Sequence, residues 1–251
     1  MNKPFEEVDS DLREFLKTGL DLKLHLAKYL KTTINDINNL LPKGSEELAA
    51  LHPKTSELTD PTSFYEEGVG TAHLLDLASW HLGSAEYIAD TLKLLKMFSR
   101  GNVLDFGGGI GTHALFAAAL DQVDHVCFVD INPQNRSFVE QRAKALALDS
   151  KISFHRDLNS TGNVCFDFVV CLDVLEHLPD PSSQLLSFLE RMNTGSIALL
   201  NWYFFKGFSG EYPFHFDDEE LIEGFFNTLQ KNFLEVFHPL LITARTYKPL
   251  I

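Results

Sequence analysis

The sequence predicts an α/β fold in which a mostly parallel sheet follows an N-terminal helical cap. From residue 102 onward, short apolar runs alternate with helical stretches, the pattern of repeated βαβ units. The chain before that point has no strand-like alternation. The last two strand candidates, residues 233–237 and 241–247, are separated by a short connection, which favours an antiparallel pair.

Residues 9–98 have a helical pattern. Leucines recur at every fourth position: Leu12, Leu16, Leu20 and Leu24. Further apolar residues widen this stripe, so we expect the helices to be buried against other elements on two sides. Another helix is expected after Ser84, a candidate N-cap. We predict a helical cap over residues 1–83 and a second domain over residues 84–251.

Seven segments are strand candidates because they are short, apolar and bounded by turn residues. They cover residues 102–106, 125–130, 151–155, 166–172, 196–201, 233–237 and 241–247.

Composition and charge exclude several classes of protein. The 251 residues carry a formal charge of −14, which repels polyphosphates, so no nucleic-acid partner is expected. No apolar run reaches the ~18 residues of a membrane span, and the first residues lack a signal-peptide pattern. The three cysteines form neither a CxxC pair nor a Cys/His cluster. We expect a cytoplasmic protein without membrane association, whose oligomeric state the sequence does not indicate.

A glycine-rich turn follows the first strand candidate, with Gly107, Gly109 and Gly111 after Asp105. Glycines permit positive φ and let the backbone approach a ligand closely. Asp130 ends the next strand, nineteen residues after Gly111. A carboxylate there can accept hydrogen bonds from both ribose hydroxyls of an adenosine, so the two features together predict a nucleoside site.

The spacing of the glycines distinguishes two enzyme classes. Dehydrogenases that bind dinucleotides use GxGxxG, in which a third glycine packs beneath a pyrophosphate. Thr112 stands at that position here, and the pattern is GxGxG with Asp105 two residues ahead of it. In this respect the chain resembles class I methyltransferases that depend on S-adenosyl-L-methionine (SAM).

Three later motifs extend this resemblance over residues 100–201. By its match to the second motif, Ile131 is placed beside the adenine ring, next to Asp130 on the ribose. Asp157 and Leu158 follow the third strand, where the family binds the adenine amine and ring. An Asp after a strand is also a common turn residue, which is the alternative for Asp157.

The fourth motif, residues 166–181, contains Asp173-Val-Leu-Glu-His-Leu-Pro-Asp-Pro. It resembles methyltransferases of small molecules, in which the strand end, here Leu172, lies against SAM. The resemblance implies a Rossmann-like, seven-stranded methyltransferase sheet of order 3-2-1-4-5-7-6, SAM as cofactor and S-adenosyl-L-homocysteine as product. It implies nothing about the first 80 residues.

Methyl transfer is an in-line displacement, which mainly requires alignment of the reactants and a base only when the nucleophile carries a proton. His177 is the candidate base, because its motif places it near the cleft and imidazole titrates near neutrality. Its alternative role is to cap or pack the turn. Tyr65, just ahead of the core, is a second candidate at the cleft.

A metal site is an alternative use of the fourth motif. Asp173, Glu176 and His177 have i, i+3, i+4 spacing, and His215 could complete the set. Some metal-dependent O-methyltransferases carry a similar ExxEH, but Asp173 departs from it and metal-free relatives share DVLEH. We therefore assign no metal ligand from the sequence.

Eight of the fifteen residues in 202–216 are aromatic, and carboxylates dominate the residues after them. Loops beyond the carboxyl ends of parallel strands bind ligands in α/β proteins. We expect methyl transfer to O, N or C of a small aromatic or hydrophobic metabolite. An RNA- or protein-modifying enzyme and a non-catalytic SAM-binding module are the alternatives.

Overall fold

The computed structural model describes residues 10–51, 61–210, 212–237 and 245–249. Its N-terminal helices and turns are α1 (Ser10–Thr18), α2 (Leu22–Tyr29), α3 (Ile34–Leu40), η1 (Leu41–Lys43), α4 (Gly44–Leu51), α5 (Pro61–Ser63), η3 (Phe64–Gly68), α6 (Ala72–Gly83) and α7 (Ala85–Phe98). The leucine stripe is interrupted between α1 and α2, where Gly19, Leu20 and Asp21 have positive φ. Ser84 precedes α7 as predicted, although its side chain makes no capping hydrogen bond.

Strands and helices alternate from residue 101 onward. The strands are β1 (Gly101–Phe106), β2 (Val123–Val129), β3 (Ile152–His155), β4 (Phe166–Cys171), β5 (Met192–Leu200), β6 (Phe233–Phe237) and β7 (Arg245–Pro249). The other elements are α8 (Thr112–Ala118), α9 (Pro133–Ala145), η4 (Asp149–Lys151), η5 (Asn159–Thr161), η6 (Leu175–His177), α10 (Pro181–Glu190) and α11 (Glu219–Asn232). β5 begins four residues before the predicted 196, and residues 241–244 of the last predicted strand lie outside the described residues.

The seven strands form one sheet in the order β3-β2-β1-β4-β5-β7-β6, as predicted. β1 is central: Val103 pairs in parallel register with Val126 of β2 and with Phe168 of β4. β7 runs antiparallel to both β5 and β6. The carboxyl ends of β1 to β5 therefore meet at one edge of the sheet, where α/β proteins place their ligands.

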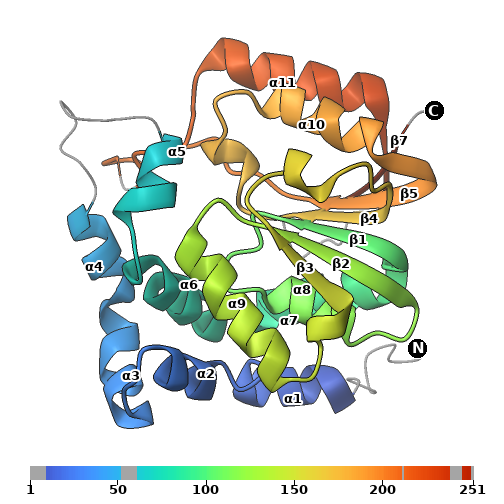
Figure 1. Cartoon of the computed structure of the whole chain (residues 1–251). Coiled ribbons are helices and arrows are strands. Elements are labelled where there is room, and N and C mark those ends of the chain that lie inside the picture. Colours follow the sequence, from blue (N-terminus) through green and yellow to red (C-terminus); the bar gives the residue numbers. More distant parts are fainter. Residues whose placement is uncertain (1–9, 52–60, 211, 238–244, 250–251) are drawn as a thin grey trace, which may run out of the picture.

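Both faces of the sheet are covered by helices (Figure 1). Because side chains alternate along a strand, Val103 faces a core that includes α7, α8 and α9, whereas Leu104 faces a core that includes α10 and α11. Strands buried on both faces explain the continuous apolar runs in the sequence.

Arg142 of α9 connects the N-terminal helices to the glycine turn. It is 1% exposed and donates to Ile110 O at 2.6 Å and to Gly19 O and Leu20 O at 3.3 Å. Burial lowers its pKa to about 9. These contacts cross the boundary predicted at residues 83 and 84, and that division stays a prediction.

None of the described helices is long and apolar enough to span a membrane. The longest, α7 and α11, have 14 residues each, whereas a span needs about 20 apolar residues.

Candidate functional site

The turn between β1 and α8 has three glycines with positive φ: 71° at Gly107, 55° at Gly109 and 74° at Gly111. A Cβ on Gly107 would lie 2.3 Å from Val174 Cγ2, and one on Gly111 would lie 2.4 Å from Val139 Cγ1. Both the backbone conformation and the packing of neighbouring side chains therefore require glycine at Gly107 and Gly111.

Asp130 follows β2 and is bonded to this turn. The Gly109 N–H donates to Oδ2 at 2.8 Å, and the Asn132 N–H donates to Oδ1 at 2.8 Å. Asn135 Nδ2 lies 3.3 and 3.2 Å from the two oxygens. Burial raises the pKa of Asp130 to about 6, although these hydrogen bonds oppose the shift. The carboxylate predicted to bind ribose holds the turn in place in this structure.

Asp105, at the end of β1, is 2% exposed, and its Oδ2 is a buried acceptor without a hydrogen-bond donor. Burial, together with the smaller effect of the Asp130 charge, raises its pKa to about 7, although a hydrogen bond with the backbone of Ala114 opposes the shift. A Cβ on Gly108 would lie 2.8 Å from this oxygen, so the atom faces the backbone of the turn. Leaving a buried acceptor without a donor costs about 1–3 kcal/mol of folding free energy. A ligand that donates a hydrogen bond to this oxygen would remove that cost.

The other predicted cofactor residues have different surroundings. Leu158 is buried in the core beside α10 and α11, Leu172 packs against the opposite core, and Ile131 is half-buried. Asp157 is half-buried and accepts a hydrogen bond from the Ser160 N–H at 2.9 Å. That bond makes Asp157 a turn residue, the alternative raised from the sequence, and its adenine contact stays a prediction.

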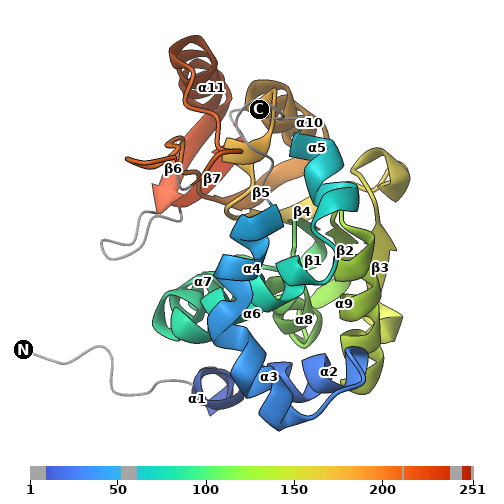
Figure 2. The same cartoon turned by 90° about the vertical axis from the view of Figure 1, so that its left-hand side faces the viewer.

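The segment α5–η3 of the N-terminal region lies against this edge of the sheet (Figure 2). Arg156 forms two bonds with Glu66, 2.5 Å from Nε to Oε1 and 2.7 Å from Nη2 to Oε2. Asn132 Nδ2 donates to Tyr65 O at 2.9 Å. These contacts join η3 to the ends of β2 and β3, so the segment covers the predicted cofactor site.

The two predicted catalytic residues are brought together: Tyr65 Oη lies 3.4 Å from His177 Nδ1. Burial lowers the pKa of His177 to about 3 and raises the pKa of Tyr65. At neutral pH the imidazole is therefore neutral and the phenol protonated. His73 contacts both this pair and α9, with its ring 5.4 Å from that of Tyr65 and Nδ1 3.4 Å from Asn135 Nδ2.

The four residues of the alternative metal set do not all converge. Glu176, His177 and His215 each offer a ligand atom, and these atoms lie within 4.8 Å of one another. Asp173 is exposed, has a φ of 55° and accepts from Asn201 Nδ2 at 2.8 Å. The helical spacing is not realised, because the chain turns at Asp173 and then forms the 3₁₀ turn η6.

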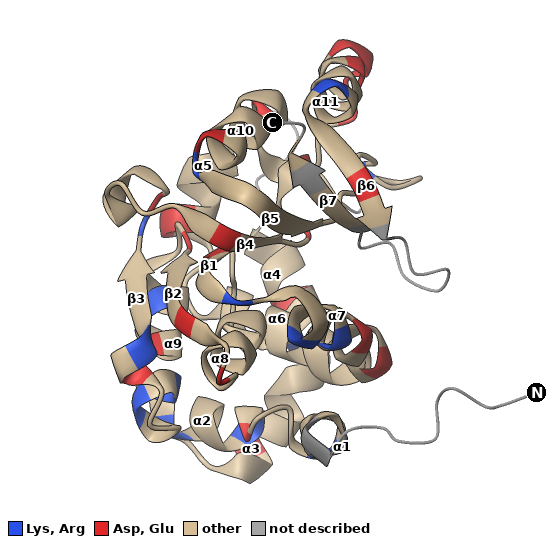
Figure 3. Ribbon diagram, turned by 90° about the vertical axis from the view of Figure 1, so that its right-hand side faces the viewer, with Lys and Arg blue, Asp and Glu red and all other residues tan. Residues whose placement is uncertain are grey.

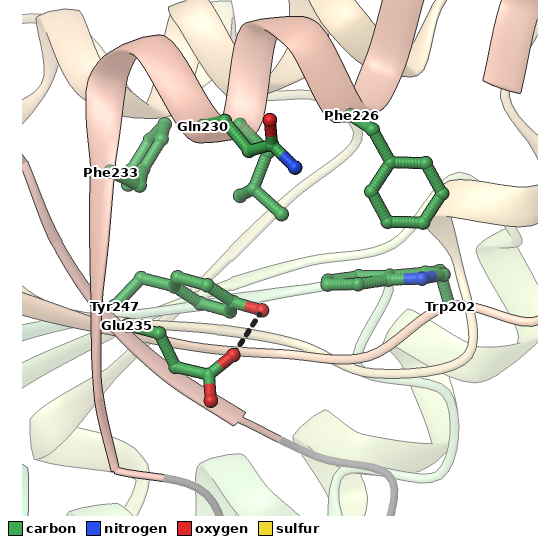
Figure 4. Close-up of a pocket in the computed structure, with 7 residues that line it drawn as sticks. Trp202, Phe226, Gln230, Phe233, Glu235 and Tyr247 are labelled. Atoms are coloured by element: carbon green, nitrogen blue, oxygen red, sulfur yellow. Dashed lines mark hydrogen bonds between the residues drawn. The ribbon is translucent and has the colours of Figure 1, made fainter. Parts of the chain in front are cut away.

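The aromatic residues of 202–216 point to different places instead of forming one wall. Phe214 stacks on Phe64 with ring centres 4.4 Å apart, whereas Phe208 is 97% exposed. Trp202 lines a cavity of about 440 Å³ under α11, shown in Figure 4. The other lining residues are Phe226, Leu229, Gln230, Phe233, Glu235 and Tyr247, the last donating to Glu235 Oε2 at 3.4 Å.

Comparison with protein-family models identifies a methyltransferase domain over residues 79–204. The chain belongs to the methyltransferase domain family. The matched half of the chain runs from α6 to just beyond β5, so it contains the glycine turn, Asp130 and η6. The resemblance to methyltransferases that the sequence motifs indicated is thereby confirmed at the level of the family.

Solved structures similar to this methyltransferase include an rRNA methylase from Streptococcus thermophilus (16% identity, 66% of this chain, 97% of that chain, TM-score 0.49). A provisionally named rRNA methylase from Clostridium thermocellum is also similar (16% identity, 65% of this chain, 97% of that chain, TM-score 0.50). At this identity the likeness concerns the fold alone. A search of curated proteins found no match.

Membership of the methyltransferase family implies SAM as the cofactor. The residues at the sheet edge fit such a molecule, since Asp105 offers a buried acceptor without a donor and Asp130 ends the adjacent strand. SAM carries the matching donors, an ammonium group and two ribose hydroxyls. The role of each residue stays a prediction.

Several residues around the methyltransferase site were missed by sequence analysis. Asn132 was recognisable, because an Asn directly before a Pro is a common helix start, and its side chain indeed caps α9. Asn135 and His73 carried no comparable signal. The pair of Glu66 and Arg156 joins residues ninety positions apart, which no local pattern reveals.

Proposed function

We propose that this methyltransferase moves a methyl group from SAM to O, N or C of a small aromatic or hydrophobic acceptor and releases S-adenosyl-L-homocysteine. The observation that carries the proposal is the partly buried pair of Tyr65 and His177, which lies at the carboxyl edge of the sheet. In this proposal residues 1–83 are a cap and residues 84–251 bind the cofactor.

The cofactor would be held by the carboxylates and the backbone of the first two strand ends. Asp130 would accept from the ribose hydroxyls, and Asp105 would face the ammonium group through its free oxygen. Gly107, Gly109 and Gly111 would let the backbone approach the amino-acid part. When bound, SAM supplies an electrophilic methyl group on a positively charged sulfur.

The adenine ring would lie among the side chains after the second and third strands. Ile131 and Leu158 would contact its faces, with Leu172 beside the SAM sulfur end of the site. Asp157 would accept from the exocyclic amine after giving up its hydrogen bond with Ser160, which is exposed and therefore weakly held.

Tyr65 and His177 would orient the acceptor. Because the phenol stays protonated, Tyr65 donates a hydrogen bond; because the pKa of His177 is about 3, its neutral imidazole accepts one without keeping a proton at neutral pH. Orientation of this kind is the main requirement of an in-line displacement.

The charge of the molecule favours a small acceptor over RNA. The formal charge is −14, and both basic and acidic residues lie on α7, α9 and α11 in Figure 3. Proteins that bind RNA through phosphates usually gather basic residues on one face. RNA and protein acceptors remain outcomes of the experiment below.

The experiment incubates the protein with methyl-labelled SAM and a cell extract, then separates small molecules, RNA and protein. Label in the small-molecule fraction is expected for the wild type. Tyr65→Phe and His177→Asn should lower that label while leaving the SAM dissociation constant unchanged. Asp124→Asn, at the exposed start of β2, is the matched control. Label only in RNA or in protein would overturn the proposed acceptor class.

A further inference from the structure

Three potential ligands meet beyond the cofactor site, at the loop after β4. Glu176 and His177 belong to η6, and His215 lies in the segment before α11. Their ligand atoms lie within 4.8 Å of one another, and the rings of His177 and His215 are 4.5 Å apart in an edge-to-face arrangement. The Phe216 N–H donates to Glu176 O at 2.8 Å and holds the two segments together.

Glu176 is 1% exposed, and its Oε2 is buried without a hydrogen-bond donor. A buried carboxylate oxygen without a partner is costly and calls for an explanation. The two neighbouring ligand groups are imidazoles, each of which has one nitrogen without a proton when neutral. A cation there would give the Glu176 oxygen the partner that it lacks.

His215 is oriented as a metal ligand would be. Its Nδ1 lies 2.8 Å from Tyr203 O, and a carbonyl can only accept, so Nδ1 carries the proton of the neutral ring. Nε2 is then the nitrogen with the lone pair. Metal-binding histidines commonly use a backbone carbonyl in this way to set the tautomer. Tyr212 stacks on the ring at 4.9 Å and further limits its movement.

We propose that Glu176, His177 and His215 bind one divalent transition-metal ion, a site that the sequence alone did not lead us to assign. Two imidazoles and one carboxylate suit zinc, iron(II) or cobalt(II) better than magnesium or calcium, which prefer oxygen ligands. Three protein ligands leave coordination positions open, as in catalytic metal sites.

The ion would stand next to Tyr65, because Tyr65 Oη contacts His177. This part of the inference rests on the proposed function: the open position takes a hydroxyl of the acceptor and lowers its pKa. The hydroxyl proton leaves to water, the oxygen forms a bond to the methyl carbon, and the electrons of the broken carbon–sulfur bond stay on sulfur. The acceptor atom is therefore oxygen.

The test uses the full-length protein, free of any affinity tag and treated with a chelator, titrated with Co²⁺ and followed by calorimetry and visible absorption. One equivalent should bind to the wild type and to His125→Asn, a control in β2 far from η6. Glu176→Gln and His215→Ala should each weaken binding by at least about tenfold. Circular dichroism checks that both variants fold.

The outcomes separate this inference from the proposed function. No Co²⁺ binding, or equal binding by folded Glu176→Gln and His215→Ala, overturns the metal site whatever the methylation results are. Bound Co²⁺ without label in any small molecule would leave the site standing and remove the proposed acceptor. Full small-molecule methylation after chelation would overturn the role of the ion in catalysis.

Discussion

The Gly109 N–H donates a hydrogen bond to Asp130 Oδ2 over 2.8 Å, so the turn and the carboxylate proposed to hold the ribose satisfy each other. With Asn132 and Asn135 also bonded to the carboxylate, few of its lone pairs are free. Cofactor binding at Asp130 would therefore exchange hydrogen bonds within the protein for hydrogen bonds to the ligand, at a small net free energy.

Asp130→Ala should weaken SAM binding by at least about tenfold, or about 1.4 kcal/mol, because it removes a charged acceptor and also loosens the turn. Isothermal titration calorimetry measures the affinity. Asp124→Asn, at the exposed start of the strand that Asp130 follows, should bind as the wild type does. An unchanged affinity of Asp130→Ala would remove Asp130 from the site.

Gly111→Ala should destabilise the protein more than Gly70→Ala does. Both glycines have positive φ, 74° and 49°, but a Cβ on Gly111 would lie 2.4 Å from Val139 Cγ1, whereas one on Gly70 meets nothing within 4 Å. We expect roughly 1–2 kcal/mol from φ alone at Gly70 and roughly 2–5 kcal/mol at Gly111. Urea denaturation gives both values, and equal losses would show that packing at Val139 does not matter.

Asp105→Asn should change the pH dependence of stability. The folded-state pKa of Asp105 is about 7, above its ordinary value of 3.8. Between these values the folded protein keeps a proton that the unfolded chain has lost, so this group's contribution to stability falls as pH rises. Asn does not titrate.

The free energy of unfolding of Asp105→Asn should therefore rise relative to wild type by up to about 1.4 kcal/mol per pH unit between pH ~4 and ~7. Urea denaturation of the cofactor-free protein at several pH values measures the difference. A difference that is constant with pH would mean that Asp105 is ionised throughout.

Arg156→Ala should let the α5–η3 segment open more often, because it removes both bonds to Glu66. The pair is largely exposed, so we expect a small effect, and hydrogen exchange in residues 61–68 should accelerate up to about fivefold. Lys144→Ala, which breaks the exposed pair with Glu140 within α9, should leave that exchange unchanged. Identical exchange in both variants would contradict the role of Arg156.

The strands and the glycine turn were predictable because each rests on local patterns: apolar runs of strand length, and glycines followed by an acid one strand later. The order of the strands in the sheet was predictable only through the resemblance to class I methyltransferases. The metal set was only partly predictable. Asp173 was included on helical spacing, but its positive φ turns the chain before η6. The carbonyl of Tyr203 that orients His215, and the contact of Glu66 with Arg156, depend on tertiary packing, which one sequence does not display.

The buried guanidinium of Arg142 limits how freely the parts of this protein can be exchanged. Its acceptors at Gly19 and Leu20 belong to the connection between the first two helices and His25 belongs to α2, while Ile110, its remaining acceptor, lies within the glycine turn. A chimera in which all the N-terminal helices were replaced to change specificity would leave the buried Arg142 guanidinium without most of its hydrogen-bond acceptors. The free energy of unfolding would fall by several kcal/mol. Engineering for new acceptors should keep α1 and α2 and vary the chain only from residue 61 onward.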